Sequence, residues 1–257
     1  MSAAGPAAAL GPLSRPQVRL VLAVSLDGRL APPEGGAAQL GGAGDRRALE
    51  EALAWADGCL IGAETLRLHG STCLIRQADL LERRRREGRP PQPWALVVSR
   101  TGRLDPQLPF FQQPVRRGLV APAGVSSSPP AGFDRLWALP MDGSPSEPRP
   151  AVGRAVETSQ DQRLLSGWPA LLVELAADGL ERLLLLGGAR LAASLLALDL
   201  VDGLQLTLVP RLLGGAHSWL PLAPLPAAAH WQLKESRPLG DGELLLHYRR
   251  LKPNQRS

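Results

Sequence analysis

Short apolar runs, separated by turn residues, recur along the chain at intervals that suit the strands of a sheet. Residues 18–24 are rich in β-forming side chains and lead into Asp27-Gly28, a strong turn signal. We therefore predict a central strand at residues 18–24. Further apolar runs predict strands at residues 58–61, 94–98, 118–120, 135–138 and 183–186.

Between these runs the apolar residues recur at helical spacing. Apolar positions share one side of residues 45–55 while Glu50 and Glu51 lie on the other side, which predicts an amphipathic helix. Asp45 is placed to act as the N-cap of this helix. Similar spacing predicts helices after residue 62, at residues 168–177 and at residues 189–200.

The order of these elements predicts the fold class. Strand and helix alternate as far as residue 200, whereas residues 204–209, 231–236 and 243–250 predict strands with no helix between them. This order is typical of an α/β fold with a mixed, mostly parallel sheet flanked by helices and with antiparallel strands at its C-terminal end. We assign a single domain to residues 15–250, a disordered tail to residues 1–14, a C-terminal tail to residues 251–257 and a surface loop to residues 140–150.

Composition and charge limit the partners of the chain. Aromatic residues make up only 4%, so stacking platforms for nucleic acid are scarce and no nucleic-acid partner is expected. The net charge of +5 is dispersed except for the arginines at residues 83–86, for which we predict a solvated helix face. Cys59 and Cys73 lack metal-binding spacing, which predicts reduced cytoplasmic thiols and no metal site. No apolar run reaches membrane-spanning length, so no membrane contact is expected.

The most specific local pattern is the strand at residues 183–186, which stops at Gly187-Gly188 and is followed at once by a helical pattern. Glycines let the backbone approach a ligand closely, and the first free N–H groups of a helix point at an anion. The pattern therefore favours a phosphate-binding turn, with a plain strand-to-helix turn as the alternative. The ordered continuation through Leu200-Val-Asp202, Pro210 and residues 213–215 makes the segment more specific than a glycine pair alone.

Taken in order, the motifs resemble those of a known family, the C-terminal reductase domain of the bifunctional riboflavin-biosynthesis deaminase/reductase, which shares the fold of dihydrofolate reductase. The resemblance covers residues 15–250 and is most similar to stand-alone cyanobacterial-type members, so we expect a reductase chain without the deaminase domain. It is carried by Arg15-Pro-Gln-Val, Ala23-Val-Ser-Leu-Asp-Gly28, Arg46-Arg47, Ala56-Asp57, Gly62-Ala-Glu-Thr65, Pro93, Gly187-Gly188, Leu200-Val-Asp202, Pro210 and Leu213-Gly-Gly215.

The resemblance implies an NADPH-dependent oxidoreductase of the 5-amino-6-(5-phosphoribosylamino)uracil reductase type. Such an enzyme transfers hydride to sugar C1 of a phosphorylated small-molecule substrate, and members of the family are typically homodimers. This chemistry needs the nicotinamide oriented against the acceptor and water excluded, so no catalytic side chain is assigned. By matching positions, the resemblance implies cofactor contacts at Ala23, Thr65, Ser99, Gly187, Gly188, Ala189, Arg190 and Leu191, and we add His69 and Arg100 from their chemistry.

Two of these positions leave alternatives open. Arg100 offers bidentate donors that suit the 2′-phosphate of NADPH, or it is an exposed loop residue, so the choice between NADPH and NADH rests on Ser99 and Arg100. His69 stands where relatives have a cofactor-contacting Asp, and it either replaces that contact or is exposed in its loop.

On the substrate side, the resemblance implies Arg76 as a contact of the substrate phosphate, and we add Cys73 and Asp27, although an Asp before Gly is commonly a turn residue. The family pattern is altered here. Ala37 and Gln39 replace a Ser and a Trp, Leu53 replaces a substrate-binding Arg and Leu186 replaces a Glu. Two alternatives therefore remain: a reductase of the same fold with a diverged substrate, or a nucleotide-binding relative without turnover.

Overall fold

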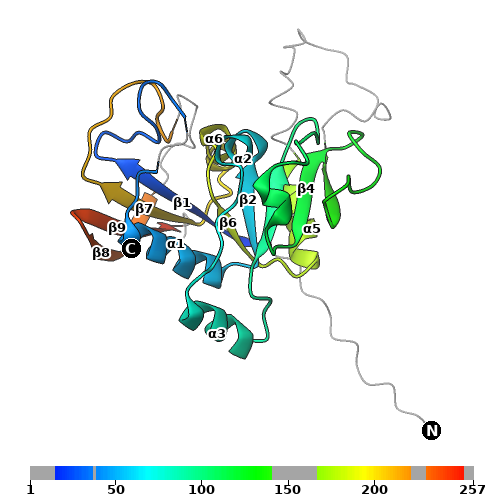
Figure 1. The fold of residues 1–257 in the computed structure, drawn as a ribbon, viewed down its shortest axis with the longest axis horizontal. Helices are drawn as coiled ribbons and strands as arrows, with labels where there is room; N and C mark the ends of the chain where they lie inside the picture. The colour runs from blue at the N-terminus through cyan, green and yellow to red at the C-terminus, as the bar shows by residue number, and fades with distance from the viewer. Residues whose placement is uncertain (1–14, 37–38, 141–166, 221–229, 252–257) are drawn as a thin grey trace.

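The computed structural model describes residues 15–36, 39–140, 167–220 and 230–251, which build one sheet flanked by helices (Figure 1). The strand order within this described part is β5-β4-β3-β2-β6-β1-β7-β9-β8. Neighbours from β5 to β7 pair in parallel, whereas β9 pairs antiparallel with β7 and β8. The strands are β1 (Gln17–Ser25), β2 (Gly58–Gly62), β3 (Trp94–Val98), β4 (Arg117–Pro122), β5 (Arg135–Leu139), β6 (Arg182–Leu185), β7 (Gly203–Val209), β8 (His230–Gly240) and β9 (Glu243–Leu251).

This architecture confirms the predicted α/β class with its antiparallel C-terminal strands. The helices are α1 (Ala43–Trp55), α2 (Ala63–His69), α3 (Ala78–Arg86), α5 (Trp168–Ala177) and α6 (Ala189–Ala197), with a short 3₁₀ turn η1 (Pro109–Gln112). Helix α6 ends three residues before the predicted Leu200, because Asp199 adopts a φ of 56° and the amide of Leu200 turns back to the carbonyl of Leu195. The predicted loop at residues 140–150 and both tails lie outside the described residues, apart from Pro140 and Leu251 at their borders.

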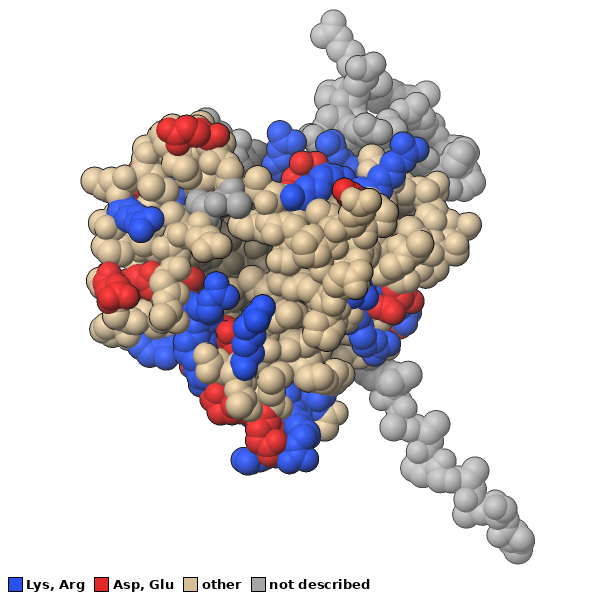
Figure 2. All heavy atoms as spheres, viewed as in Figure 1, with Lys and Arg blue, Asp and Glu red and all other residues tan. Residues whose placement is uncertain are grey.

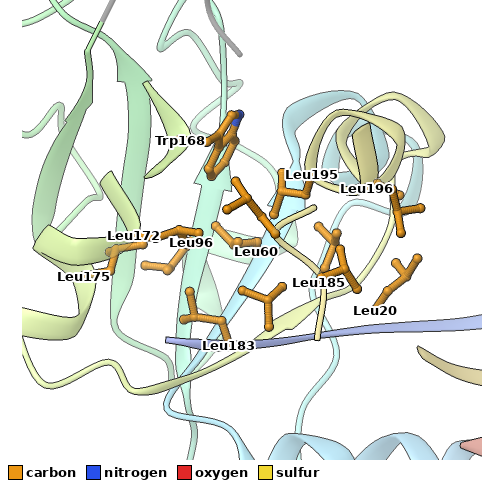
Figure 3. Packing of buried hydrophobic residues seen from close by; sticks show 14 of the residues in the cluster. Leu20, Leu60, Leu96, Trp168, Leu172, Leu175, Leu183, Leu185, Leu195 and Leu196 are labelled. Carbon is orange, nitrogen blue, oxygen red and sulfur yellow. The ribbon is translucent and has the colours of Figure 1, made fainter. Parts of the chain in front are cut away.

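Alternation along the strands divides the core between the two faces of the sheet. Leu183 and Leu185 of β6 pack on the face covered by α5 and α6, where the side chains of Figure 3 meet. Leu184 points to the opposite face and packs with residues of α1 and α3. Because β6 is buried on both faces, its sequence is a continuous leucine run, as expected for a central parallel strand.

The arginines at residues 83–86 do not form the uniformly solvated face that we predicted. Arg84 is 1% exposed, and its guanidinium donates to the carbonyls of Ala54 and Ala56 at the end of α1 and of Pro90. Arg85 and Arg86 remain exposed and pair with Glu82 within α3. The prediction failed at Arg84 because the last carbonyls of α1 have no partner within their own helix and can accept from any nearby donor. Here the donor is Arg84, which belongs to α3, so the sequence around it does not reveal the contact.

The start of α1 also differs from the sequence prediction. The helix begins at Ala43, and no side chain caps Gly42 from within the helix, so Asp45 lies in the first turn and is not the N-cap. Instead, the Gly42 amide donates to Glu243 Oε1 at 2.6 Å. The carboxylate that satisfies this helix end therefore comes from β9, about two hundred residues away in sequence, where no local pattern reveals it.

Candidate functional site

The candidate site lies where the carboxyl ends of β1, β2 and β6 meet. Strand β6 stands between β1 and β2, and the chain leaves these strands toward helices on both faces of the sheet. Ligands of open α/β sheets bind outside the carboxyl ends of the strands at such a point. Figure 2 shows the surface hollowed near the middle of the face drawn, with Lys and Arg side chains along the lower edge of the hollow.

The glycine turn after β6 has a backbone that only glycine adopts readily. Gly187 has a φ of 102° and Gly188 a φ of 83°, and helix α6 starts at Ala189 without a side-chain cap. The first bond of the helix runs from the amide of Ala192 to the carbonyl of Gly188, so the preceding amides have no carbonyl partner within α6. This arrangement suits a bound phosphate group.

Thr65 of α2 lies against the same turn. A Cβ placed on Gly188 would stand 3.2 Å from Thr65 Oγ1 and 3.9 Å from the Cα of Gly62. The amide of Leu186 donates to the carbonyl of Leu60 at 2.9 Å, which fixes the turn over the end of β2. The structure thus brings Thr65 together with the turn at residues 187–188, as their expected shared role requires. The missing side chain at Gly188 leaves the backbone open to a ligand, so these residues fit a dinucleotide diphosphate.

Ala23 lies near the end of β1, next to the same turn. It is half-buried on the α1 face of the sheet and pairs with Thr207 of β7. The preceding residue, Leu22, has its Cδ2 atom 3.6 Å from the position of a Cβ on Gly187. Ala23 therefore lies beside the glycine turn, which agrees with the cofactor contact expected for both.

The other expected cofactor residues lie further along the edge. Ser99 is buried just after β3, where its amide donates to Val120 and its Oγ accepts from the amide of Gly102. Arg100 is exposed beside it. His69 is exposed at the last position of α2, a full turn beyond Thr65. These residues are not in the cluster around Gly188, and they would meet only a ligand that extends along the edge.

Asp27 joins the two loops that follow β1 and β7. Its carboxylate accepts from the amide of Leu213 at 3.1 Å, from the amide of Gly214 at 2.7 Å and from Ser25 Oγ at 2.5 Å. These hydrogen bonds, led by that of Ser25, lower the pKa of Asp27 to about 2. The carboxylate thus holds the two loops together through these hydrogen bonds, which favours the turn role of Asp27 over direct substrate contact.

This arrangement predicts an acid-sensitive loop. The folded-state pKa of Asp27 lies below its ordinary value near 4, so the contribution of the carboxylate is complete above about pH 4 and is lost as the pH falls toward 2. We expect the amide resonances of Leu213 and Gly214 to titrate together with a midpoint near 2 in NMR spectra. Asp27→Asn should abolish this titration, whereas two independent midpoints in the wild-type chain would contradict a shared partner.

Arg76 and Cys73 lie on the loop that faces α1. Both side chains are exposed, and the amides of Arg76 and Gln77 donate to Glu50 Oε2 at 2.7 and 2.9 Å. Glu50 is 2% exposed, so it does not lie on an outer helix face as the periodicity predicted. It is a positioning residue that the sequence did not reveal, because its partners are backbone amides and carry no sequence signal.

Two of the altered substrate positions lie in an apolar cluster next to this loop. Leu53 is completely buried, and Leu186 is half-buried against the same cluster, which also contains Ile75 and Leu184. Gln39 is exposed, and Ala37 lies outside the described residues. The two leucines that replace charged family residues thus share one apolar cluster.

Asp45 is a second carboxyl that sequence reasoning did not assign to the site. It is half-buried in the first turn of α1, where burial raises its pKa and the hydroxyl of Thr207 lowers it. Since Thr207 pairs with Ala23, Asp45 stands over the strands at the glycine turn.

Among the residues that the structure describes, no group of three or more His, Cys, Asp and Glu side chains is placed to bind a metal. Nor does any described helix have the length and apolar character to cross a membrane.

Comparison with known proteins identifies the family. The model of the RibD C-terminal domain matches residues 16–245. The chain is 26% identical over 204 residues to a 2,5-diamino-6-ribosylamino-4(3H)-pyrimidinone 5′-phosphate reductase of Archaeoglobus fulgidus, covering 79% of this chain and 84% of the relative.

Solved structures show the same fold. A pyrimidine reductase-like protein of Corynebacterium diphtheriae superposes with a TM-score of 0.66 at 19% identity, covering 92% of each chain. A deaminase/reductase of Thermotoga maritima gives 0.65 at 19% identity, covering 92% of this chain and 57% of the longer one. The chain therefore belongs to the RibD C-terminal domain family, the riboflavin-biosynthesis pyrimidine reductases that its motifs resemble.

Proposed function

We propose that this protein is an NADPH-dependent reductase that transfers hydride to sugar C1 of a phosphorylated ribosylamino-pyrimidine. The observation that carries the proposal is the glycine turn, where Gly188, Thr65 and the uncapped start of α6 meet at the carboxyl edge of the sheet. The reductase name of the Archaeoglobus fulgidus relative supports the substrate class.

The residues at this edge fit a dinucleotide cofactor. The amides of residues 189–191 and Thr65 Oγ1 would hold its diphosphate, and Ala23 would contact the nicotinamide end through its backbone. Ser99 and Arg100 follow β3 further along the edge, where a guanidinium suits a 2′-phosphate, so we expect NADPH to bind more tightly than NADH. Bound there, the cofactor supplies the hydride, and the protein supplies orientation and a dry site.

A specific observation also favours a second candidate, a reductase of the same fold with a different substrate. Leu53 is completely buried and Leu186 is half-buried in one apolar cluster beside the loop of Arg76. Charged hydrogen bonds are worth roughly 1.5–3 kcal/mol each, so losing two of them changes which ligand the site prefers.

The assay that tests the proposal follows NADPH oxidation with the ribosylamino-pyrimidine phosphate, beside a fluorescence titration of NADPH. Turnover with this substrate is the expected result. Tight NADPH binding without turnover would support the diverged substrate or a relative without turnover. Failure to bind NADPH would overturn the cofactor site and every function built on it.

Arg76→Ala tests the substrate side separately. We expect KM for the phosphorylated substrate to rise about 10- to 100-fold, since a phosphate loses a charged donor, while the Kd of NADPH changes less than about twofold. Arg86→Ala is the matched control, because Arg86 is also exposed but lies at the end of α3 paired with Glu82. Equal loss of cofactor and substrate affinity in Arg76→Ala would contradict this assignment.

A further inference from the structure

The carboxyl of Asp45 differs from the other carboxylates around the site. Glu50 is committed to the amides of Arg76 and Gln77, Glu243 to that of Gly42, and Asp27 to the loop after β7. Asp45 instead faces a side-chain hydroxyl, that of Thr207, which lowers its pKa. Its side chain folds back over Gly41, where it leaves no room for a Cβ.

The groups that face Asp45 come from every element packed around it. Thr207 approaches from β7, Glu243 from β9, Arg46 from the next position of α1 and the Cys73 thiol from the loop after α2. From β8, the carbonyl of the uncharged Leu239 lies against Gly44, the residue before Asp45. Burial raises the pKa of Asp45 most, the negative charge of Glu243 raises it further, and Thr207 and Arg46 lower it.

The position of Asp45 relates it to both halves of the site. Thr207 pairs directly with Ala23, and paired strands lie about 4.8 Å apart, so Asp45 stands beside the expected nicotinamide contact. Glu50, which fixes the backbone of Arg76, lies five positions further along α1, about 7.5 Å at 1.5 Å per residue. A substrate with its phosphate at Arg76 would thus extend along α1 toward Asp45.

We propose that Asp45 is a catalytic acid, which delivers the proton that balances hydride addition to the substrate. This inference rests on the proposed function. In the ring-opened imine, the hydride with its electron pair bonds to sugar C1, and the π electrons of the C1–N bond move to nitrogen. That nitrogen takes the proton from the Asp45 carboxyl, which leaves a secondary amine and an Asp45 carboxylate. Because Asp45 is only half-buried, water can restore its proton after each turnover.

The first test replaces Asp45 with asparagine, which keeps the shape and the acceptor for Thr207 but carries no acidic proton. We expect kcat to fall about 100-fold or more, within the range for a lost general acid, with KM and the Kd of NADPH changed less than about threefold. Asp79→Asn is the control, because Asp79 is exposed on α3 and pairs with Arg47 outside the site. Its kcat should equal that of the wild-type chain.

The second test uses the two neighbours of Asp45, which shift its pKa in opposite directions. The rate should fall as the pH rises through the Asp45 pKa, because the acid loses its proton. Glu243→Gln removes a negative charge and should move this fall to lower pH, whereas Thr207→Val removes a donor and should move it to higher pH. Carboxyl NMR titration of Asp45 in each variant should give the same two directions without any turnover.

These outcomes separate the inference from the proposed function. Wild-type turnover with an Asp45→Asn enzyme that keeps its kcat, or with pH profiles that Glu243→Gln and Thr207→Val leave in place, would overturn the role of Asp45 alone. A wild-type chain that binds NADPH and leaves the pyrimidine substrate unreduced would overturn the proposed function, and with it this role.

Discussion

Replacing Arg84 with alanine is expected to lower the free energy of unfolding by about 3–5 kcal/mol, the largest effect on stability that the structure predicts. The guanidinium is buried and charged, since burial lowers its pKa only to about 10. It donates to Ala56 at 2.7 Å, to Ala54 at 3.0 Å and to Pro90 at 2.6 Å. Alanine would remove the donor to Pro90 and would leave Ala54 and Ala56 only the hydrogen bonds from Arg89, in a site that water cannot readily reach. Urea or guanidinium denaturation measures the change.

Arg83→Ala is the matched control for this prediction. Arg83 precedes Arg84 in the same helix, is half exposed and approaches Glu87 at only 4.0 Å. Exposed ion pairs of this kind contribute little, so the change should stay below about 1 kcal/mol. Equal losses in Arg83→Ala and Arg84→Ala would show that Arg84 does not tie α3 to the end of α1.

The largest effect on function is expected for Gly188→Ala, which should raise the Kd of NADPH about 10- to 100-fold. A residue other than glycine at this φ costs about 1–3 kcal/mol, and the new Cβ would stand 3.2 Å from Thr65 Oγ1, on the surface proposed to meet the diphosphate. Fluorescence titration measures cofactor affinity, and thermal unfolding measures stability in the same samples.

Gly179→Ala separates the two effects. Gly179 has nearly the same φ, 82°, but a Cβ there would meet nothing within 4 Å, and the residue follows α5 away from the glycine turn. Both variants should lose stability through backbone strain, while only Gly188→Ala should lose NADPH affinity. Unchanged affinity in Gly188→Ala would place the diphosphate elsewhere.

The fold was largely predictable because its strongest signals are local. The leucine run of β6 identifies a strand buried on both faces, and Gly187-Gly188 marks the turn into α6, so both appear where the sequence predicts them. Late strands without helices between them indicated the antiparallel end of the sheet, and β8 and β9 pair as expected.

The polar network of the site was much less predictable. Glu50 was assigned to solvent by periodicity and Arg84 by its run of charges, yet both are buried because they satisfy backbone groups of distant segments. Asp45 was expected to cap its own helix, whereas Glu243 takes that role and Asp45 meets Thr207. Such contacts depend on which segments the sheet order brings together, and backbone partners carry no residue identity that a sequence pattern can show.

On the substrate side, too, the sequence identified residues but not how they pack together. The resemblance identified Leu53 and Leu186 as departures, but only the structure shows that both pack in one apolar cluster beside the Arg76 loop. Both changes therefore fall in one apolar cluster, on the side of the site where we propose that the pyrimidine binds.

The proposed reaction transfers hydride from a nicotinamide held at the glycine turn to the sugar of a phosphorylated pyrimidine. The most direct measurement uses NADPH carrying deuterium at both C4 positions of the nicotinamide ring and locates the label in the product by NMR and mass spectrometry. One deuterium is expected at sugar C1 of a ribitylamino product. A reduced product without deuterium at C1, or no product from a chain that binds NADPH, would contradict it.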